Sequence, residues 1–238
     1  MAQGQRLPIV ATLITFLAVV IMFALGLWQL QRADEKNQRQ NMIAQASSSD
    51  PLQIETAKQM GESARDFPVR LLGLADSQRY FLLDNRIQEG RVGYEVLTVV
   101  NSQQGNVVVN LGWLAAPALR ADLPQVSIAS EQQTYEGMLS IPQKNNFISE
   151  TAVSNQQWPK LLQQIDVTFM EQIYGQELLP FVILLDESSD SDFVRKWQPV
   201  VMPPEKHIAY AIQWFLLAFA ALIIFVIAQR RKFIRETK

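Results

Sequence analysis

Residues 206–228 read KHIAYAIQWFLLAFAALIIFVIA, an apolar run with no charged residue after its start. A helix needs roughly 20 apolar residues to cross a hydrocarbon core, so this run predicts a transmembrane helix over 207–228. A second run, LPIVATLITFLAVVIMFALGLWQL at 7–30, carries no charge and predicts a first span. These two runs decide the fold, because together they predict a two-span membrane protein with one domain between the spans.

The basic tail predicts how the spans are oriented. Residues 229–238 read QRRKFIRETK, and clusters of Lys and Arg beside a span stay in the cytoplasm. We therefore expect residues 1–6 and 229–238 in the cytoplasm and 31–206, which hold almost all of the acidic residues, outside it. The basic residues that follow the first span argue weakly for the opposite orientation. The first run exceeds the signal-peptide core of about 7–15 residues, so we expect an uncleaved anchor.

The region between the spans is expected to form one β-rich domain. Its clearest hairpin joins 93–100 to 106–113, since both arms are rich in Val and aromatic residues. Alternation in the second arm predicts a half-buried strand. Further strands are expected at 67–74, 79–85, 135–141, 181–185 and 193–198, and helical segments at 31–46, 51–61 (capped by Asp50 or Ser49), 117–122 and 158–174. The predicted fold class is a membrane protein of the α+β class. Two transmembrane helices flank a mostly antiparallel β-sheet or small β-barrel domain with one or two helices.

Composition and motifs exclude several classes of protein. The external region lacks the basic, aromatic-interleaved surface of a nucleic-acid binder. The chain has no cysteine, and no P-loop, dinucleotide-binding or zinc-protease spacing occurs. Asp84 and Glu95 could form an acid–base pair, but nothing in their spacing requires it. We expect a structural role for the notable residues of this region, which are Asp84, Asn85, Arg86, Gly93, Tyr94, Asn110, Gly112 and Trp113. We expect no catalytic residue and no enzyme activity.

His207, the only histidine of the chain, opens the second span. Neutral imidazole is a common ligand of transition metals and of haem iron, so His207 is the best candidate ligand in the sequence. The alternative is that it only anchors the end of the helix. His207, Tyr210, Ala211, Trp214 and Ala218 recur at three- and four-residue spacing, which predicts that they share one stripe of the helix.

The end of the first span carries a second unusual set of residues. Gly26 permits close approach of another helix, and Gln29 is able to hydrogen-bond across to the second span. Trp28 lies between them in the sequence. Arg32 could pair with an acidic group such as a haem propionate, or extend to the lipid headgroups. In the expected orientation this end of the first span lies at the same membrane face as His207.

Several blocks of sequence, in a fixed order, resemble a known family. They are LGLWQLQR at 25–32, GYEVLT at 93–98, VNLGW at 109–113, WPKLLQQID at 158–166 and KHIAYAIQWF at 206–215. In this order the chain resembles the surfeit locus protein 1 family, the cytochrome c oxidase assembly factors of mitochondria and bacteria. The resemblance covers nearly the whole chain, and its two terminal blocks are the specific ones. One departure is Leu111, where the family often has Arg.

The resemblance implies an assembly factor that helps to insert haem, typically haem a, into subunit I of a haem–copper oxidase. It implies that His207 corresponds to the family's haem-linked histidine and that Trp214 lines the same site. With Tyr210, Trp28 and Arg32, these residues make the expected haem-binding set, and haem would be bound transiently. The expected partners are oxidase subunit I, haem A synthase and the lipid bilayer. The expected location is the cell inner membrane, with a periplasmic central domain.

Other functions stay open at this point. A structural assembly factor would use the external domain to hold oxidase subunits while His207 only packs. A sensor is disfavoured because few residues follow the second span, and a hydrolase because no catalytic constellation appears.

Overall fold

The structure, a computed structural model, describes residues 9–119, 122–148, 150, 157–187, 192–197 and 202–236. It divides into two compact units. One is a helix pair drawn from Met1–Met42 and Val200–Lys238, and the other is a domain over Ile43–Pro199.

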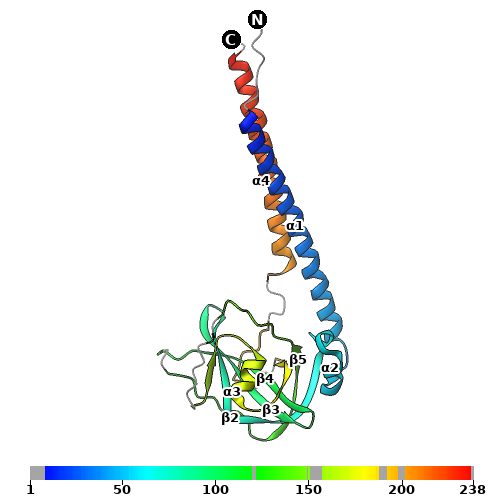
Figure 1. Ribbon diagram of the computed structural model, residues 1–238, viewed down its shortest axis with the longest axis vertical. Coiled ribbons are helices and arrows are strands. Elements are labelled where there is room, and N and C mark those ends of the chain that lie inside the picture. The colour runs from blue at the N-terminus through cyan, green and yellow to red at the C-terminus, as the bar shows by residue number, and fades with distance from the viewer. Residues whose placement is uncertain are drawn as a thin grey trace. The chain divides into compact units, whose positions relative to one another are not determined.

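The helix pair consists of α1 (Ile9–Ser47) and α4 (Pro204–Glu236), which lie side by side in Figure 1. Both helices are long and apolar enough to cross a membrane, and only 6% and 11% of their most apolar windows are buried. Helices that expose apolar side chains almost everywhere suit lipid rather than a soluble core. The two-span prediction is therefore confirmed, as is the predicted helix over 31–46.

The residues that α1 and α4 bury follow a heptad pattern. In α1 the less exposed positions alternate by three and four residues, and they include Met22, Gly26, Gln29 and Ala33. In α4 the same alternation runs through Pro204, His207, Ala211, Trp214 and Ala218. Such spacing makes a continuous seam between two helices, and small residues on it let the backbones come close.

Strands of the domain close into a small barrel. The strands are β2 (Pro68–Gln88), β3 (Arg91–Ser102), β4 (Gly105–Ala115), β5 (Gln132–Ser140) and β7 (Leu178–Leu185). Their order is β2-β3-β4-β7-β5, and β5 pairs again with β2. Only the β4–β7 pairing within this ring is parallel. Of the two expected architectures, the small barrel is the one that forms.

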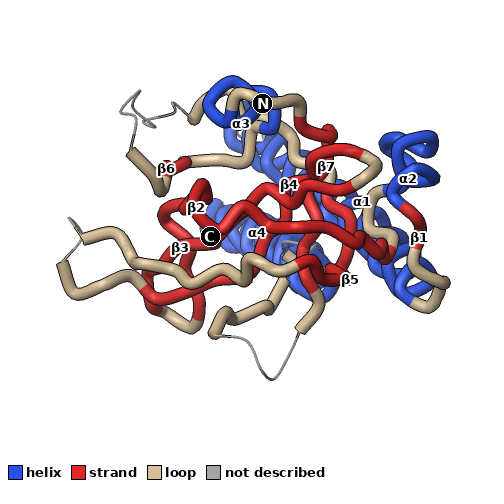
Figure 2. The backbone as a smooth tube through the Cα atoms, turned by 90° about the horizontal axis from the view of Figure 1, so that it is seen from below, coloured by secondary structure: helices blue, strands red, loops and turns tan. Residues whose placement is uncertain are grey.

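Shorter elements pack around the barrel. Strand β1 (Leu52–Gln53), helix α2 (Ile54–Met60) and the 3-10 turn η1 (Gly61–Ala64) precede β2, while β6 (Lys160–Leu162) and α3 (Val167–Tyr174) precede β7. In Figure 2, α3 and β6 lie on one side of the domain and α2 and β1 on another. Residues of α2 and η1 join the core inside the barrel, whereas residues of β6 and α3 belong to a second core outside it.

The two cores divide by strand alternation. Every barrel strand contributes alternate residues to the inner core, for example Leu71, Val96, Val109, Leu139 and Ile183. The outer core takes the residues between them, with Met170 and Tyr174 of α3 packed on the sheet, and it includes Phe81, Leu97, Val108 and Val182. Strand β4 is consequently buried on both faces. The prediction of a half-buried strand at 106–113 is wrong, because the second face is covered as well: Val108 lies in the outer core with α3, and the segment 193–195 packs against Gly112.

Several predicted boundaries need correction. The strands expected at 67–74 and 79–85 are one long strand, β2, with a register shift between Ala75 and Tyr80. The helix expected at 158–174 begins only at Val167, because Lys160–Leu162 pairs in parallel with 81–83 as β6. The strand expected at 193–198 is reduced to one bridge, Trp113–Val194, with residue 198 outside the described residues.

Two further predictions are partly right. The short helix expected at 51–61 forms as α2, but its N-cap is Gln53 rather than Asp50 or Ser49. Of the helical turn expected at 117–122, residues 120 and 121 lie outside the described residues, and Asp122 N–H donates a hydrogen bond to the Leu119 carbonyl (3.1 Å).

A polar network ties α3 to the irregular part of β2. Asp76 accepts hydrogen bonds from Arg79 Nε (2.7 Å) and from the Tyr174 hydroxyl (3.0 Å). The Arg79 guanidinium also lies over the Tyr174 ring, 4.2 Å from its centroid. Burial raises the pKa of Asp76, but the hydrogen bonds from Arg79, Gln78 and Tyr174 together lower it below its ordinary value.

The lowered pKa of Asp76 predicts a pH-dependent contribution to stability. Because the folded-state pKa lies below the unfolded one of about 3.9, the contribution is present above that value and is lost as pH falls through the folded-state pKa. We expect Asp76→Asn to lower the free energy of unfolding by about 1.5–3 kcal/mol at neutral pH and by less at acid pH. Urea unfolding followed by tryptophan fluorescence measures this. Glu55→Gln, at an exposed pair with Lys58, is the control and should change little.

Candidate functional site

The polar pair His207 and Gln29 lies in the seam between α1 and α4. His207 Nδ1 and Gln29 Oε1 are 2.7 Å apart. His207 is 7% exposed, although an imidazole normally seeks water or a polar partner. The expectation that Gln29 hydrogen-bonds across to the second span is confirmed, and its partner is the histidine itself.

The other ring nitrogen of His207 is unusual. Nε2 is buried and has no hydrogen-bond partner among the residues that the structure describes. Leaving a buried polar atom without a partner costs roughly 1–3 kcal/mol, so such an atom in a folded protein calls for a reason. Since protein atoms cover Nε2, a ligand would reach it only after neighbouring side chains had moved aside.

Close packing of the helices holds this pair in place. A Cβ atom added to Gly26 would lie 2.4 Å from a ring carbon of Phe215, so any larger residue there would require the Phe215 ring to move. The rings of Phe23 and Phe215 are tilted against each other, with centroids 5.3 Å apart. The expected close approach at Gly26 is therefore confirmed. The contacts 29–207 and 23–215 also show that the helices run antiparallel.

The two flanks of the seam differ in character. With 3.6 residues per turn, and counting from the Gln29–His207 contact in an antiparallel pair, Phe23 and Phe215 emerge on one flank, in agreement with their observed contact. By the same geometry Trp28, Arg32 and Tyr210 emerge on the opposite flank. One flank is thus closed by packed rings, and the other carries aromatic and basic side chains.

The second flank is accessible. Trp28 is 49% exposed and Tyr210 44%. Arg32 lies over the Trp28 ring, 5.8 Å from its centroid, and pairs with Glu35 at 2.7 Å. We name Trp28, Arg32 and Tyr210 the aromatic flank. Along the helix axes, the two exposed rings lie within about one helical turn of the buried His207 imidazole.

The stripe expected on the second span separates into two groups. His207, Ala211 and Ala218 are buried in the seam, and Trp214 is half-buried beside them. Tyr210 leaves the seam for the aromatic flank, because a strict alternation of three and four from His207 passes through 211 and 214. The structure thus brings His207 and Gln29 into contact, places Trp214 two turns along α4 and leaves Trp28 and Tyr210 exposed.

The notable residues of the external domain serve its architecture. Glu95 accepts a hydrogen bond from Asn110 Nδ2 (2.7 Å) and lies 3.5 Å from Arg86 Nε. The Trp113 indole donates to the Arg86 carbonyl at 2.9 Å. Gly112 has φ of 126° and leaves no room for a Cβ beside Phe193, which explains why a glycine stands there. These contacts brace the β2–β3–β4 corner and support the expected structural role.

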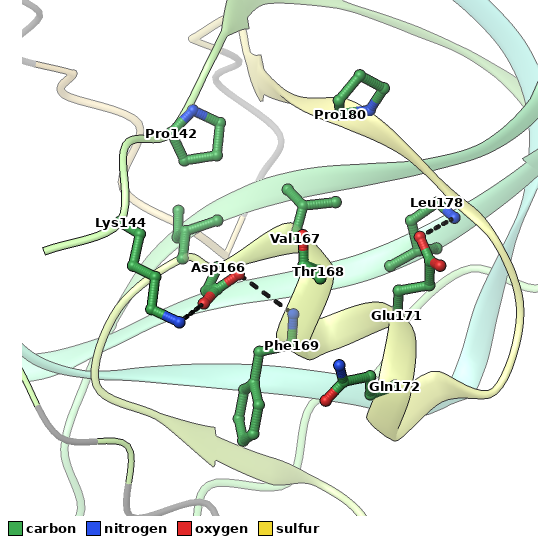
Figure 3. Close-up of a pocket in the computed structure, with 11 residues that line it drawn as sticks. Pro142, Lys144, Asp166, Val167, Thr168, Phe169, Glu171, Gln172, Leu178 and Pro180 are labelled. Carbon is green, nitrogen blue, oxygen red and sulfur yellow. Dashed lines mark hydrogen bonds and ion pairs between the residues drawn. The ribbon is translucent and has the colours of Figure 1, made fainter. Parts of the chain in front are cut away.

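A cleft lies beside α3, and Figure 3 shows the residues that line it. Asp166 caps α3 by accepting from Phe169 N–H (3.2 Å) and pairs with Lys144 Nζ (2.9 Å). Glu171 accepts from Leu178 N–H at 3.3 Å. The charged groups of the cleft therefore hold the helix and its connections. Within the described residues no group of three His, Asp or Glu side chains is placed to hold a metal ion.

Comparison with known proteins adds one result. The SURF1 family model matches residues 16–219, which include both ends of the seam and the whole barrel. A search of curated proteins gives no match.

Proposed function

We propose a function from the fact that this chain belongs to the SURF1 family of cytochrome oxidase assembly factors. The chain carries haem for the oxidase and binds it at the helix pair. The observation that supports the proposal is the buried Nε2 of His207, which has no hydrogen-bond partner among the described residues. A haem iron would give that nitrogen a bonding partner, and a single axial imidazole suits a protein that must also release its cargo.

The side chains near His207 support the proposal. The aromatic flank offers exposed rings to the porphyrin, and the Arg32 guanidinium lies on the same flank for a propionate, although it now pairs with Glu35. Trp214, half-buried in the seam, would meet the apolar part of the ring. When bound, the haem supplies the iron and the hydrophobic surface, while the protein supplies one nitrogen ligand and two apolar walls.

We further propose that the haem is haem a, received from haem A synthase and passed to oxidase subunit I. The chain would lie in the cell inner membrane with both termini in the cytoplasm and the barrel in the periplasm. The basic residues at the C-terminal end of α4 and the acidic character of the external domain support this orientation. We propose no enzymatic activity, because delivery requires binding and release only.

The experiment that tests the proposal is purification of the full chain in detergent from cells with and without a co-expressed haem A synthase. We expect protein-bound haem in near-stoichiometric amounts, with the absorption spectrum of haem a only when the synthase is present. Protein that remains free of haem in both preparations, while still supporting oxidase assembly, would contradict the proposal. That result would favour a structural assembly factor.

One observation favours the structural alternative. A polar pair in an otherwise apolar seam is a known device for fixing the register of two helices. On this reading His207 and Gln29 align α1 with α4, and the barrel alone holds oxidase subunits. The register function leaves Nε2 unexplained, which is why haem binding is the preferred proposal.

A further inference from the structure

We propose that Gln29 is the positioning residue that holds His207 in the Nδ1–H tautomer, so that the lone pair of Nε2 is reserved for the iron. This inference rests on the proposed function for its purpose, but its physical content is a property of the protein without haem.

The tautomer follows from the contact. The Gln29 carboxamide oxygen is only an acceptor, so the hydrogen in the 2.7 Å contact belongs to His207 Nδ1. A neutral imidazole carries one hydrogen, and Nε2 is then a bare acceptor. Nε2 has no hydrogen-bond partner among the described residues, which agrees with a nitrogen that carries no hydrogen.

The helix pair makes the contact rigid. Gln29 and His207 are both seam residues, and Gly26, one turn from Gln29, lies against the Phe215 ring, so the helices approach closely next to the contact. Glutamine has three rotatable bonds, and the half-buried position of Gln29 in the seam restricts them. A histidine whose second nitrogen donates to a fixed oxygen is oriented in the way that metal-ligating histidines usually are, and loss of such an oxygen costs about 10–100-fold in metal affinity.

The test uses the fact that the chain has one histidine, so that ¹⁵N-labelled histidine reports His207 alone. The full chain in detergent, free of haem, is compared with Gln29→Met and Gln29→Glu. Methionine keeps the length of the side chain but removes the acceptor, whereas glutamate keeps an acceptor oxygen. The matched control is Gln213→Met, at an exposed position of α4.

We expect the wild type and Gln213→Met to give the two ¹⁵N shifts of a neutral imidazole protonated at Nδ1, and Gln29→Glu to keep the hydrogen on Nδ1. Gln29→Met should populate the other tautomer. In haem titrations Gln29→Met should bind about 10–100-fold more weakly, Gln29→Glu should bind well, and the iron–histidine stretch should shift between these two variants.

Other outcomes separate the two proposals. A wild type protonated at Nε2, or a Gln29→Met variant with unchanged tautomer and haem affinity, overturns the positioning role while haem binding by the wild type stands. A tautomer that depends on Gln29 in a wild type that binds no haem overturns the proposed function, and with it the purpose assigned to Gln29.

Discussion

Replacing His207 with alanine is expected to weaken haem binding by more than about 100-fold, because loss of an outer-shell partner alone costs about 10–100-fold and this change removes the ligand itself. The measurement is haem content after purification, together with titration of the haem-free protein followed by its Soret absorption. No other imidazole or thiolate is able to replace the lost ligand, because His207 is the only histidine of the chain and the chain contains no cysteine.

Two further variants separate ligation from packing. His207→Gln keeps a polar side chain next to Gln29 but has no imidazole, so it should also lose haem while the helix pair stays intact. Imidazole added to His207→Ala should restore part of the haem spectrum, since the free base is able to occupy the space left by the ring. Phe219→Leu, at a side chain that is 62% exposed, is the control for a change in α4 and should bind haem normally. Equal haem content in His207→Ala and the wild type would remove His207 from the site.

The sequence predicted the membrane part well because its signal is long and uniform. Twenty or more apolar residues without charge have few alternatives, and both helices formed where they were expected. Sequence reasoning also placed Gln29 and His207 at the same end of the helix pair. It did not assign Tyr210 to a flank, because the stripe from 207 to 218 fits both a broad helical face and a strict heptad seam.

The barrel was harder to predict for a different reason. The β3–β4 hairpin is local, so its Val-rich arms and short turn identified it. Barrel closure depends on β5 meeting β7 and β2, which lie far apart in the chain, and no local pattern records that pairing. The segment 158–174 shows the same limit, because Leu161 and Leu162 fit a helical face until their pairing with β2 places them in a strand.

In the described part of the chain, the contact between Phe23 and Phe215 was not predicted, although the sequence contains the information for it. Phe23 and Phe215 sit at matching depths of the two spans, each near a small or seam residue, and their contact could have been predicted once an antiparallel pair was assumed. The lack of a hydrogen-bond partner at His207 Nε2 could not be predicted from the sequence, since it depends on which ring nitrogen contacts Gln29. The candidate site was therefore predictable as a set of residues and not as a geometry.

The second large effect is a loss of stability expected from a substitution at Gly137, where strands β5 and β7 close the barrel. This residue pairs with Leu185 across β5 and β7. A Cβ atom at position 137 would lie 2.1 Å from the Leu184 carbonyl oxygen and 2.8 Å from the Leu185 Cα. Because those atoms are backbone, no side-chain rotation relieves the clash, and the strands must separate where the ring closes.

Gly137→Ala is therefore expected to lower the free energy of unfolding by about 3 kcal/mol or more. This value lies at the upper end of the losses of stability that overpacked sites show. For a domain of this size the melting temperature should fall by about 6–12 °C. Tryptophan fluorescence of the full chain in detergent suits the measurement, because Trp113, Trp158 and Trp197 belong to the domain, while the spans stay helical in micelles.

The matched control for this change is Gly175→Ala. Gly175 has φ of 80° and ends α3, and nothing lies within 4 Å of an added Cβ. Its replacement only places an alanine in the left-handed backbone conformation, which lowers the free energy of unfolding by about 1–2 kcal/mol. A Gly137→Ala variant no less stable than Gly175→Ala would mean that β5 and β7 do not approach closely. The ring would then be open, and the inner core would need another wall at that edge.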